Sequence, residues 1–207
     1  MATHFPDGQS TGMAARLRRL LLSPEREWGA IDAEPMSALR LFLTWAVPLA
    51  AIGPAARCVK SILFGIDLLG FHYQPSTEMA VATALSAYAM ALISVWLIAL
   101  AIDALAPSFG GEKDGDQAMK VAVFSMVPVW LAGLLALLPF IGFLAYVGLY
   151  SLYLAYLGLP RLMRARSDKA LLYVAAVVML GLALTLVGAS VANSVGNLFA
   201  APGTVVG

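Results

Sequence analysis

Residues 117–160 read QAMKVAVFSMVPVWLAGLLALLPFIGFLAYVGLYSLYLAYLGLP, and no charged residue lies between Lys120 and Arg161. One helix over the intervening residues would be about 60 Å long, roughly twice the thickness of a bilayer's hydrocarbon core. Pro139 and Gly142 lie near the middle of the stretch, where they favour a tight turn. The stretch therefore predicts two membrane spans, over residues 121–138 and 140–159, joined by a very short connection.

The composition agrees with a membrane protein. Hydrophobic residues make up 61% of the chain and charged residues 12%, whereas soluble proteins carry about 25% charged residues. The net charge of +1 gives no reason to expect a nucleic-acid partner. A single cysteine, Cys58, excludes an internal disulfide and a metal site built from several cysteines. The first apolar run begins only near Leu39, so we expect no cleavable signal peptide.

Together with the remaining apolar runs, the two spans predict an all-α, polytopic membrane protein with short interfacial helices. Five transmembrane helices are predicted, at about residues 39–56, 79–102, 121–138, 140–159 and 171–192. We expect a cytoplasmic segment over residues 1–37, a membrane domain over 38–192 and an extracytoplasmic tail over 193–207. Between the first two spans, we expect a short amphipathic helix over residues 55–66 and a loop over 67–78.

The N-terminal segment contains two candidate helices. Residues 13–22, MAARLRRLLL, place leucines on one helical face and arginines on the other. Such a helix lies flat on an anionic membrane surface, and the alternative is a frayed basic tail. Ser23 and Pro24 are typical of a helix start, and the second helix should end before Pro35. Its Trp28 suits the headgroup layer.

The distribution of lysine and arginine predicts the orientation. With the N-terminus inside, only Arg57 and Lys60 of the thirteen Lys and Arg residues lie outside, and the other eleven lie inside. Cytoplasmic loops carry such an excess of positive charge. A missed or added span would mix the two groups, so the asymmetry also supports five spans and an extracytoplasmic C-terminus.

The residues needed for catalysis are missing from the predicted spans. An ionisable residue deep in a span would suggest a functional site, and none is present. The two histidines, His4 and His72, lie in the N-terminal segment and in a loop. Ser125 has no nearby base, and we expect its hydroxyl to bond its own helix. We therefore expect no catalytic residue, no metal and no cofactor, and hence no enzyme.

Several polar and helix-interrupting residues remain as candidates. Tyr146, Tyr150 and Tyr153 share one face of the fourth span. They either pack with their hydroxyls bonded to a neighbouring helix, or form a polar stripe that faces lipid or a partner helix. Pro128 and Trp130 suggest a kink in the third span, and glycines and a proline mark the cytoplasmic ends of the second and fourth.

These motifs, in their order, resemble the Yip family of Ypt/Rab-interacting membrane proteins, and specifically its bacterial branch. The resemblance covers about residues 23–192. It rests on Pro24-x-x-x-Trp28-x-x-Ile31, Phe109-Gly110-Gly111, Gln117-Ala118-x-Lys120, Ser125-x-x-Pro128-x-Trp130-Leu131, Leu138-Pro139-x-x-Gly142, Tyr150-Ser151-x-Tyr153-Leu154 and Gly158-Leu159-Pro160.

The resemblance implies five spans with a cytoplasmic N-terminus, as the charge distribution does. Eukaryotic members of the family contact prenylated Rab GTPases in early secretory traffic and pair with one another in the membrane. Their cytoplasmic D-L-Y-G-P signature is absent from this chain, because Asp67-Leu68-Leu69-Gly70 differs from it and lies on the opposite side. Rab binding is therefore not expected.

Two functions stay open. One is a non-enzymatic interaction or scaffold protein of the bacterial inner membrane, whose partners are membrane lipid, a second copy or another membrane protein. The other is a small transporter or channel, which needs a polar path that the uncharged spans do not offer. The candidate interaction residues are Pro24, Trp28, Gly110, Gly111, Lys120, Ser125, Pro128, Trp130, Tyr146, Tyr150, Tyr153, Gly158 and Pro160.

Overall fold

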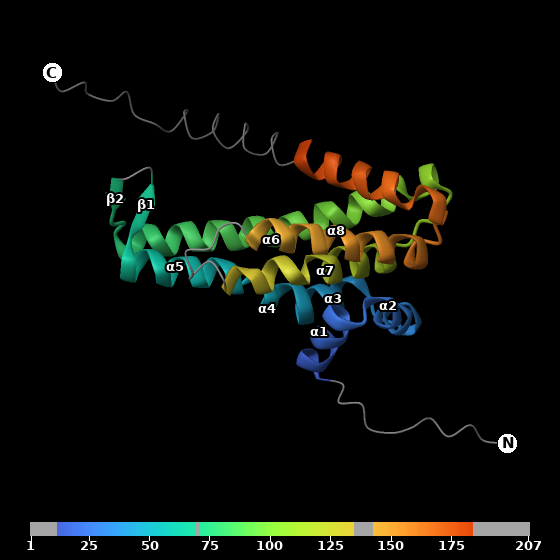
Figure 1. The fold of residues 1–207 in the computed structure, drawn as a ribbon, viewed down its shortest axis with the longest axis horizontal. Helices are drawn as coiled ribbons and strands as arrows, with labels where there is room; N and C mark the ends of the chain where they lie inside the picture. Colours follow the sequence, from blue (N-terminus) through green and yellow to red (C-terminus); the bar gives the residue numbers. More distant parts are fainter. Residues whose placement is uncertain (1–11, 69–70, 135–142, 184–207) are drawn as a thin grey trace.

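The structure is a computed structural model that describes residues 12–68, 71–134 and 143–183. It is a bundle of helices with one small hairpin of strands (Figure 1). The α-helices are α1 (Met13–Leu22), α2 (Pro24–Ala33), α3 (Ala38–Leu41), α4 (Val47–Ala50), α5 (Ile52–Phe64), α6 (Thr77–Leu105), α7 (Gly115–Ala132) and α8 (Phe143–Leu162). A further helical segment covers residues 170–183, and the 3-10 turns η2 (Ala106–Phe109) and η4 (Ser167–Lys169) lie in the connections.

The first apolar run forms one helical stretch from Ala38 to Phe64, in which a π-helical turn η1 (Phe42–Ala46) separates α3 from α4. The span predicted over residues 39–56 lies within this stretch, and the amphipathic helix predicted over 55–66 largely corresponds to α5, which follows α4 directly after Ala51. Pro48 and Pro54 lie in the first turns of α4 and α5. Each proline lacks an amide hydrogen, and each follows a departure from regular α-helix, at η1 and at Ala51.

The connection between the first two spans also differs from the expected loop. Strands β1 (Ile66–Leu68) and β2 (Phe71–Tyr73) pair antiparallel, with Ile66 opposite Tyr73. Gly65 ends α5 with a positive φ of 69°, which glycine adopts without strain. Ser76 caps the start of α6, because its hydroxyl accepts from the Met79 amide at 3.2 Å.

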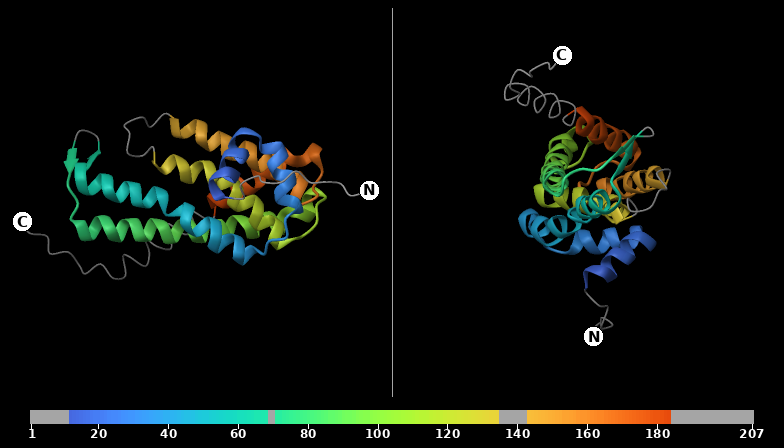
Figure 2. Two further views of the ribbon diagram at one scale, coloured as in Figure 1. Left: turned by 90° about the horizontal axis from the view of Figure 1, so that it is seen from below. Right: turned by 90° about the vertical axis from the view of Figure 1, so that its left-hand side faces the viewer.

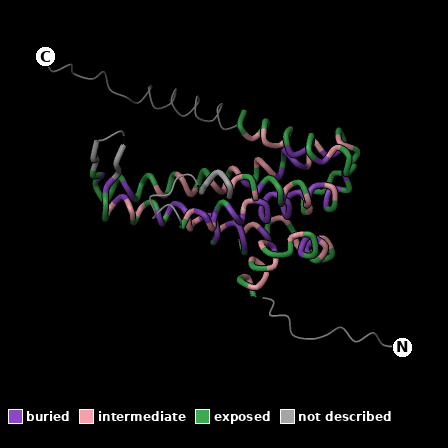
Figure 3. The backbone as a smooth tube through the Cα atoms, in the orientation of Figure 1, coloured by how far each residue is buried: buried purple, intermediate pink, exposed green. Residues whose placement is uncertain are grey.

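Helix α6 contains the predicted second span and extends it at both ends. Most of its apolar side chains are not buried by the rest of the protein (Figure 3). Within the described residues, Ala38–Phe64 and Thr77–Phe109 are the two helical stretches long and apolar enough to cross a membrane. Apolar side chains left uncovered along a helix of this length are the surface that lipid would cover.

Helix α7 is the centre of the bundle. Every residue from Ala118 to Pro128 except Met126 is buried, and α3, α6 and α8 pack around it. Gly53 and Gly133 allow the first helical stretch to touch it, because a Cβ atom at Gly133 would lie 2.5 Å from the Gly53 Cα. Pro128 lies inside α7 without ending it.

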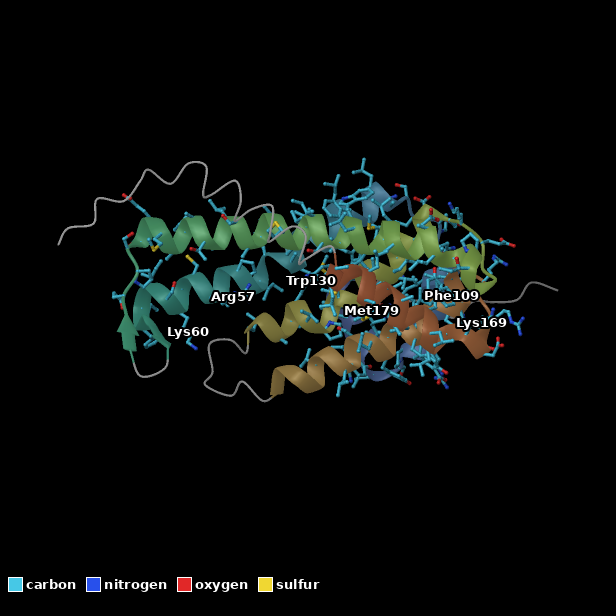
Figure 4. All side chains as sticks on the ribbon, turned by 90° about the horizontal axis from the view of Figure 1, so that it is seen from above. Arg57, Lys60, Phe109, Trp130, Lys169 and Met179 are labelled. Carbon is cyan, nitrogen blue, oxygen red and sulfur yellow. The ribbon has the colours of Figure 1, made fainter. Side chains whose placement is uncertain are left out.

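The two ends of the bundle carry different connections (Figures 1 and 2). Helix α2, η2 and η4 lie at one end, and the strand hairpin lies at the other. Figure 4 shows Phe109 and Lys169 at the first end and Arg57 and Lys60 toward the second. Connections expected on one side of the membrane therefore lie at one end of the fold. The predicted turn at Pro139–Gly142, the end of the fifth span and the two tails lie outside the described residues.

Candidate functional site

The N-terminal helices α1 and α2 pack against α7 and α8, and we call this contact the N-terminal dock. Trp28 is completely buried in it. The Trp28 ring lies over Gly158 of α8, where an added Cβ would come within 2.8 Å of the ring atom Cζ2. On α7, Phe124 meets the same ring edge-on, with centroids 6.3 Å apart. Helix α2 approaches α8 this closely because residue 158 has no side chain.

A buried carboxylate holds α1 onto α2. Glu27 is 3% exposed and accepts from the Arg16 Nε at 3.1 Å and from the Arg19 Nε at 2.7 Å. The hydrogen bond between Arg19 and Glu27 raises the pKa of the Arg19 guanidinium. The helix predicted over residues 13–22 does form, and it is not a frayed tail. Leu20 on its apolar face is fully buried by protein, so this side chain does not enter lipid.

Further ties join the dock to the two central helices. Lys120 of α7 is 4% exposed, and its Nζ donates to the Glu34 carbonyl at 2.7 Å. Because Glu34 follows the last residue of α2, the ammonium group stabilises the negative end of that helix. The Tyr150 hydroxyl of α8 donates to the Leu21 carbonyl of α1 at 2.8 Å.

Beside the dock, the connection after α6 packs against the connection after α8. Gly110 has a positive φ of 74°, and a Cβ at Gly111 would lie 2.5 Å from the Met163 carbonyl oxygen. These two glycines let the η2 connection run against the chain after α8, where the Glu112 amide donates to the Met163 carbonyl at 2.9 Å. Near the end of α8, Pro160 is inside the helix.

A cavity of about 400 Å³ lies between α6, α7, α8 and the segment 170–183. Apolar side chains make up most of its wall, and no charged residue lines it. Ser125 of α7 and Ser151 of α8 also line it, and they are 7% and 8% exposed. Neither Oγ has a hydrogen-bond partner. The bond expected between Ser125 and its own helix is therefore absent.

The other predicted residues are spread over the bundle. Pro24 starts α2 as expected, although the Ser23 side chain makes no capping bond. Trp130 and Pro128 of α7 are both buried. Tyr153 is 42% exposed, and its ring lies 5.8 Å from the ring of the partly buried Tyr150.

The side chain of Tyr146 lies outside the described residues, so the three-tyrosine stripe is described only in part. Sequence reasoning missed Glu27 and Ser151. The opposite charges of Glu27 and the arginines of α1 gave some signal for the first. Ser151 was marked by its position in an apolar span, like that of Ser125, and by its place in the family motif Tyr150-Ser151-x-Tyr153-Leu154. Among the described residues, no group of three His, Cys, Asp or Glu side chains is placed to hold a metal ion.

The part of the chain that matches a known family includes most residues of the dock and of the cavity wall. The family model of the Yip1 domain matches residues 18–188, from α1 through the described helices. No curated protein and no solved structure matches the chain. The family match confirms the resemblance to the Yip family, and with the two long apolar helical stretches it points to a membrane protein. The chain belongs to the Yip1 domain family.

Proposed function

We propose that the chain is a non-enzymatic interaction protein of the bacterial inner membrane. It crosses the bilayer five times, with the N-terminus in the cytoplasm. The N-terminal dock forms a rigid cytoplasmic platform on which a second copy or another membrane protein binds. One observation carries the proposal: the family motif residues Trp28, Lys120 and Gly158 join α2 to α7 and α8. They are used to hold a surface in place rather than to surround a reacting group.

The arrangement of charged segments supports the orientation. The N-terminal helices and the connections after α6 and α8 lie at one end of the bundle and contain most of the basic residues. Arg57 and Lys60, in contrast, are on α5 toward the hairpin end (Figure 4). A positive cytoplasmic face is the usual result of membrane insertion.

The wall of the cavity favours an interaction protein over a transporter. A path for a polar solute needs polar groups along its length, whereas this wall is apolar apart from serine hydroxyls. The dock also carries charged side chains at its surface, since Arg18 of α1 and Arg26 of α2 are exposed. Exposed arginines on rigid helices suit recognition of a partner's carboxylates.

Two experiments test this function. Reporters that are active only outside the cytoplasm should work at Gly207 and stay silent in the 160–170 connection. A photocrosslinking residue at Arg26 of the dock should then give one discrete adduct in native membranes, either a dimer or a partner. The same residue at the exposed Leu85 of α6 is the control and should not give this adduct. An active reporter in the 160–170 connection, or the same adducts at both positions, would contradict the proposal.

A further inference from the structure

The cavity between α6, α7, α8 and the segment 170–183 is closed toward the end that carries the dock. Ile102, Leu159 and Val174 line it there and are almost fully buried. Behind them, the Tyr173 hydroxyl donates to the Ile102 carbonyl, and the Phe109 ring stacks on Tyr173 at 4.7 Å. A ligand therefore has no direct route into the cavity from the water at this end.

The opposite part of the cavity wall faces outward. Met90 and Ile93 of α6 and Leu182 of the last described helix line the cavity, and each is at least half exposed. These side chains form an apolar mouth. A ligand that enters past them comes sideways out of the bilayer rather than out of water.

Among the described residues, five buried side-chain atoms have no hydrogen-bond partner, and two of them are the hydroxyls of Ser125 and Ser151 in the cavity wall. Ser86 and Ser94 of α6 each donate to the carbonyl four residues earlier, at 2.9 and 2.7 Å. Ser125 and Ser151 have the same local option, are more than nine-tenths buried and make no hydrogen bond. Because an unpaired hydroxyl in an apolar wall costs free energy, these two groups indicate a ligand atom that would pair with them.

The depth of the hydroxyls limits the kind of ligand. Ser125 follows Lys120 by five residues and Ser151 precedes Arg161 by ten, which is roughly 8 and 15 Å along the two helices. In the five-span arrangement proposed above, this places both hydroxyls inside a hydrocarbon core about 30 Å thick, beneath its cytoplasmic surface. The charged headgroup of a phospholipid stays at the surface, because charge is costly at that depth. A neutral lipid has no such anchor.

We infer that this cavity binds a neutral, single-chain lipid whose carbonyl or hydroxyl head accepts hydrogen bonds from Ser125 and Ser151. Its chain leaves through the mouth between α6 and the segment 170–183. The volume of about 400 Å³ is at the lower end of the roughly 300–1,000 Å³ of ligand pockets, so it holds the head and the first part of the chain. This inference rests on the proposed function, through the depth that the five spans assign to the two serines.

The test uses the full-length protein in vesicles of phosphatidylethanolamine and phosphatidylglycerol. Two photoactivatable probes carry the same chain with a diazirine at the same carbon, one as a long-chain alcohol and the other as a phosphatidylglycerol. The alcohol should label peptides of α7 and α8 that line the cavity, and excess unlabelled alcohol should compete. Equal labelling of these peptides by the phosphatidylglycerol probe would overturn the inference, because the cavity would then hold an ordinary acyl chain.

Matched variants separate binding from folding. Ser125→Ala and Ser151→Ala should each lower labelling about fivefold, the usual effect of one lost hydrogen bond. Ser86→Ala, whose serine lies outside the cavity wall, is the control. Gly181→Leu should block the mouth, since Gly181 lines the cavity and a Cβ there meets open space. Gly148→Leu on α8 is its control, because a Cβ there also meets nothing within 4 Å and Gly148 does not line the cavity.

Labelling that survives both serine changes would overturn the inference, as would failure of the alcohol to label the wall at all. The serine variants are nearly isosteric with the parent, so they keep the test valid if Gly181→Leu does not fold. The reporter fusions at Gly207 and in the 160–170 connection remain a separate measurement. A wrong topology with intact, serine-dependent labelling would contradict the proposed five spans and leave the binding site in place.

Discussion

The N-terminal dock and the cavity use the same two helices, α7 and α8, but differ in most of their polar groups. In the dock, Glu27, Lys120 and Tyr150 each have a partner within 3.1 Å, although the Trp28 Nε1 has no partner. In the cavity wall, the hydroxyls of Ser125 and Ser151 have none. A fold gains stability from satisfied groups and loses it from unsatisfied ones. The difference indicates that the dock is a structural element and that the cavity is where a ligand is expected.

Loss of the dock's aromatic anchor should give the largest effect. Trp28→Ala removes a completely buried ring and should cost about 3–5 kcal/mol of docking free energy. Helices α1 and α2 should then be cleaved faster by protease in mild detergent, while the membrane helices stay protected. Trp96→Ala on α6 is the control, because Trp96 is 37% exposed and lies outside the dock. Equal protection in parent and Trp28→Ala would show that the dock does not depend on this ring.

Removal of the buried charge should have the next largest effect. Glu27→Gln leaves two arginines facing a neutral amide and should cost about 2 kcal/mol of docking free energy, because hydrogen bonds to charged groups are strong. The same proteolysis assay measures it. The matched control is Asp168→Asn, whose ion pair with Arg166 is more than half exposed on both sides. That control should show no change, and a larger loss there than at Glu27 would contradict the assignment.

The tyrosine pair tests the boundary of the dock. Tyr150→Phe leaves the Leu21 carbonyl without its donor and should cost about 1 kcal/mol of stability, seen as a lower melting temperature in detergent. Tyr153→Phe should change melting less, because Tyr153 is 42% exposed. An equal loss at both positions would support the predicted stripe, in which the tyrosines act together.

The smallest change should have the opposite sign. In protein stripped of lipid, Ser125→Ala and Ser151→Ala remove buried hydroxyls that have no partner, and each should raise stability by up to about 1 kcal/mol. The melting temperature should therefore rise, in contrast to Tyr150→Phe. A fall in the serine variants would mean that the hydroxyls are bonded within the protein, and the contrast between dock and cavity would disappear.

The local pattern of apolar and charged residues was sufficient to predict the position of the long apolar helix α6. The long uncharged run after Glu78 predicted α6 within a few residues, because a helix that faces lipid along its length is marked by composition alone. The family motifs also identified Trp28, Lys120 and Gly158 as important positions. Their roles could not be predicted, since each depends on a contact between helices more than eighty residues apart in the chain.

The sequence by itself determined which segments are apolar helices and how the charges separate along the chain, since both depend on composition over short windows. Tertiary structure alone decided what the polar groups meet. Arg16 and Arg19 of α1 bond Glu27 because α2 folds back beside them. Ser125 lost its expected bond and instead lines a cavity that exists only because four helices leave a space between them. Partner choice depends on distances in space, and a single sequence does not contain these distances.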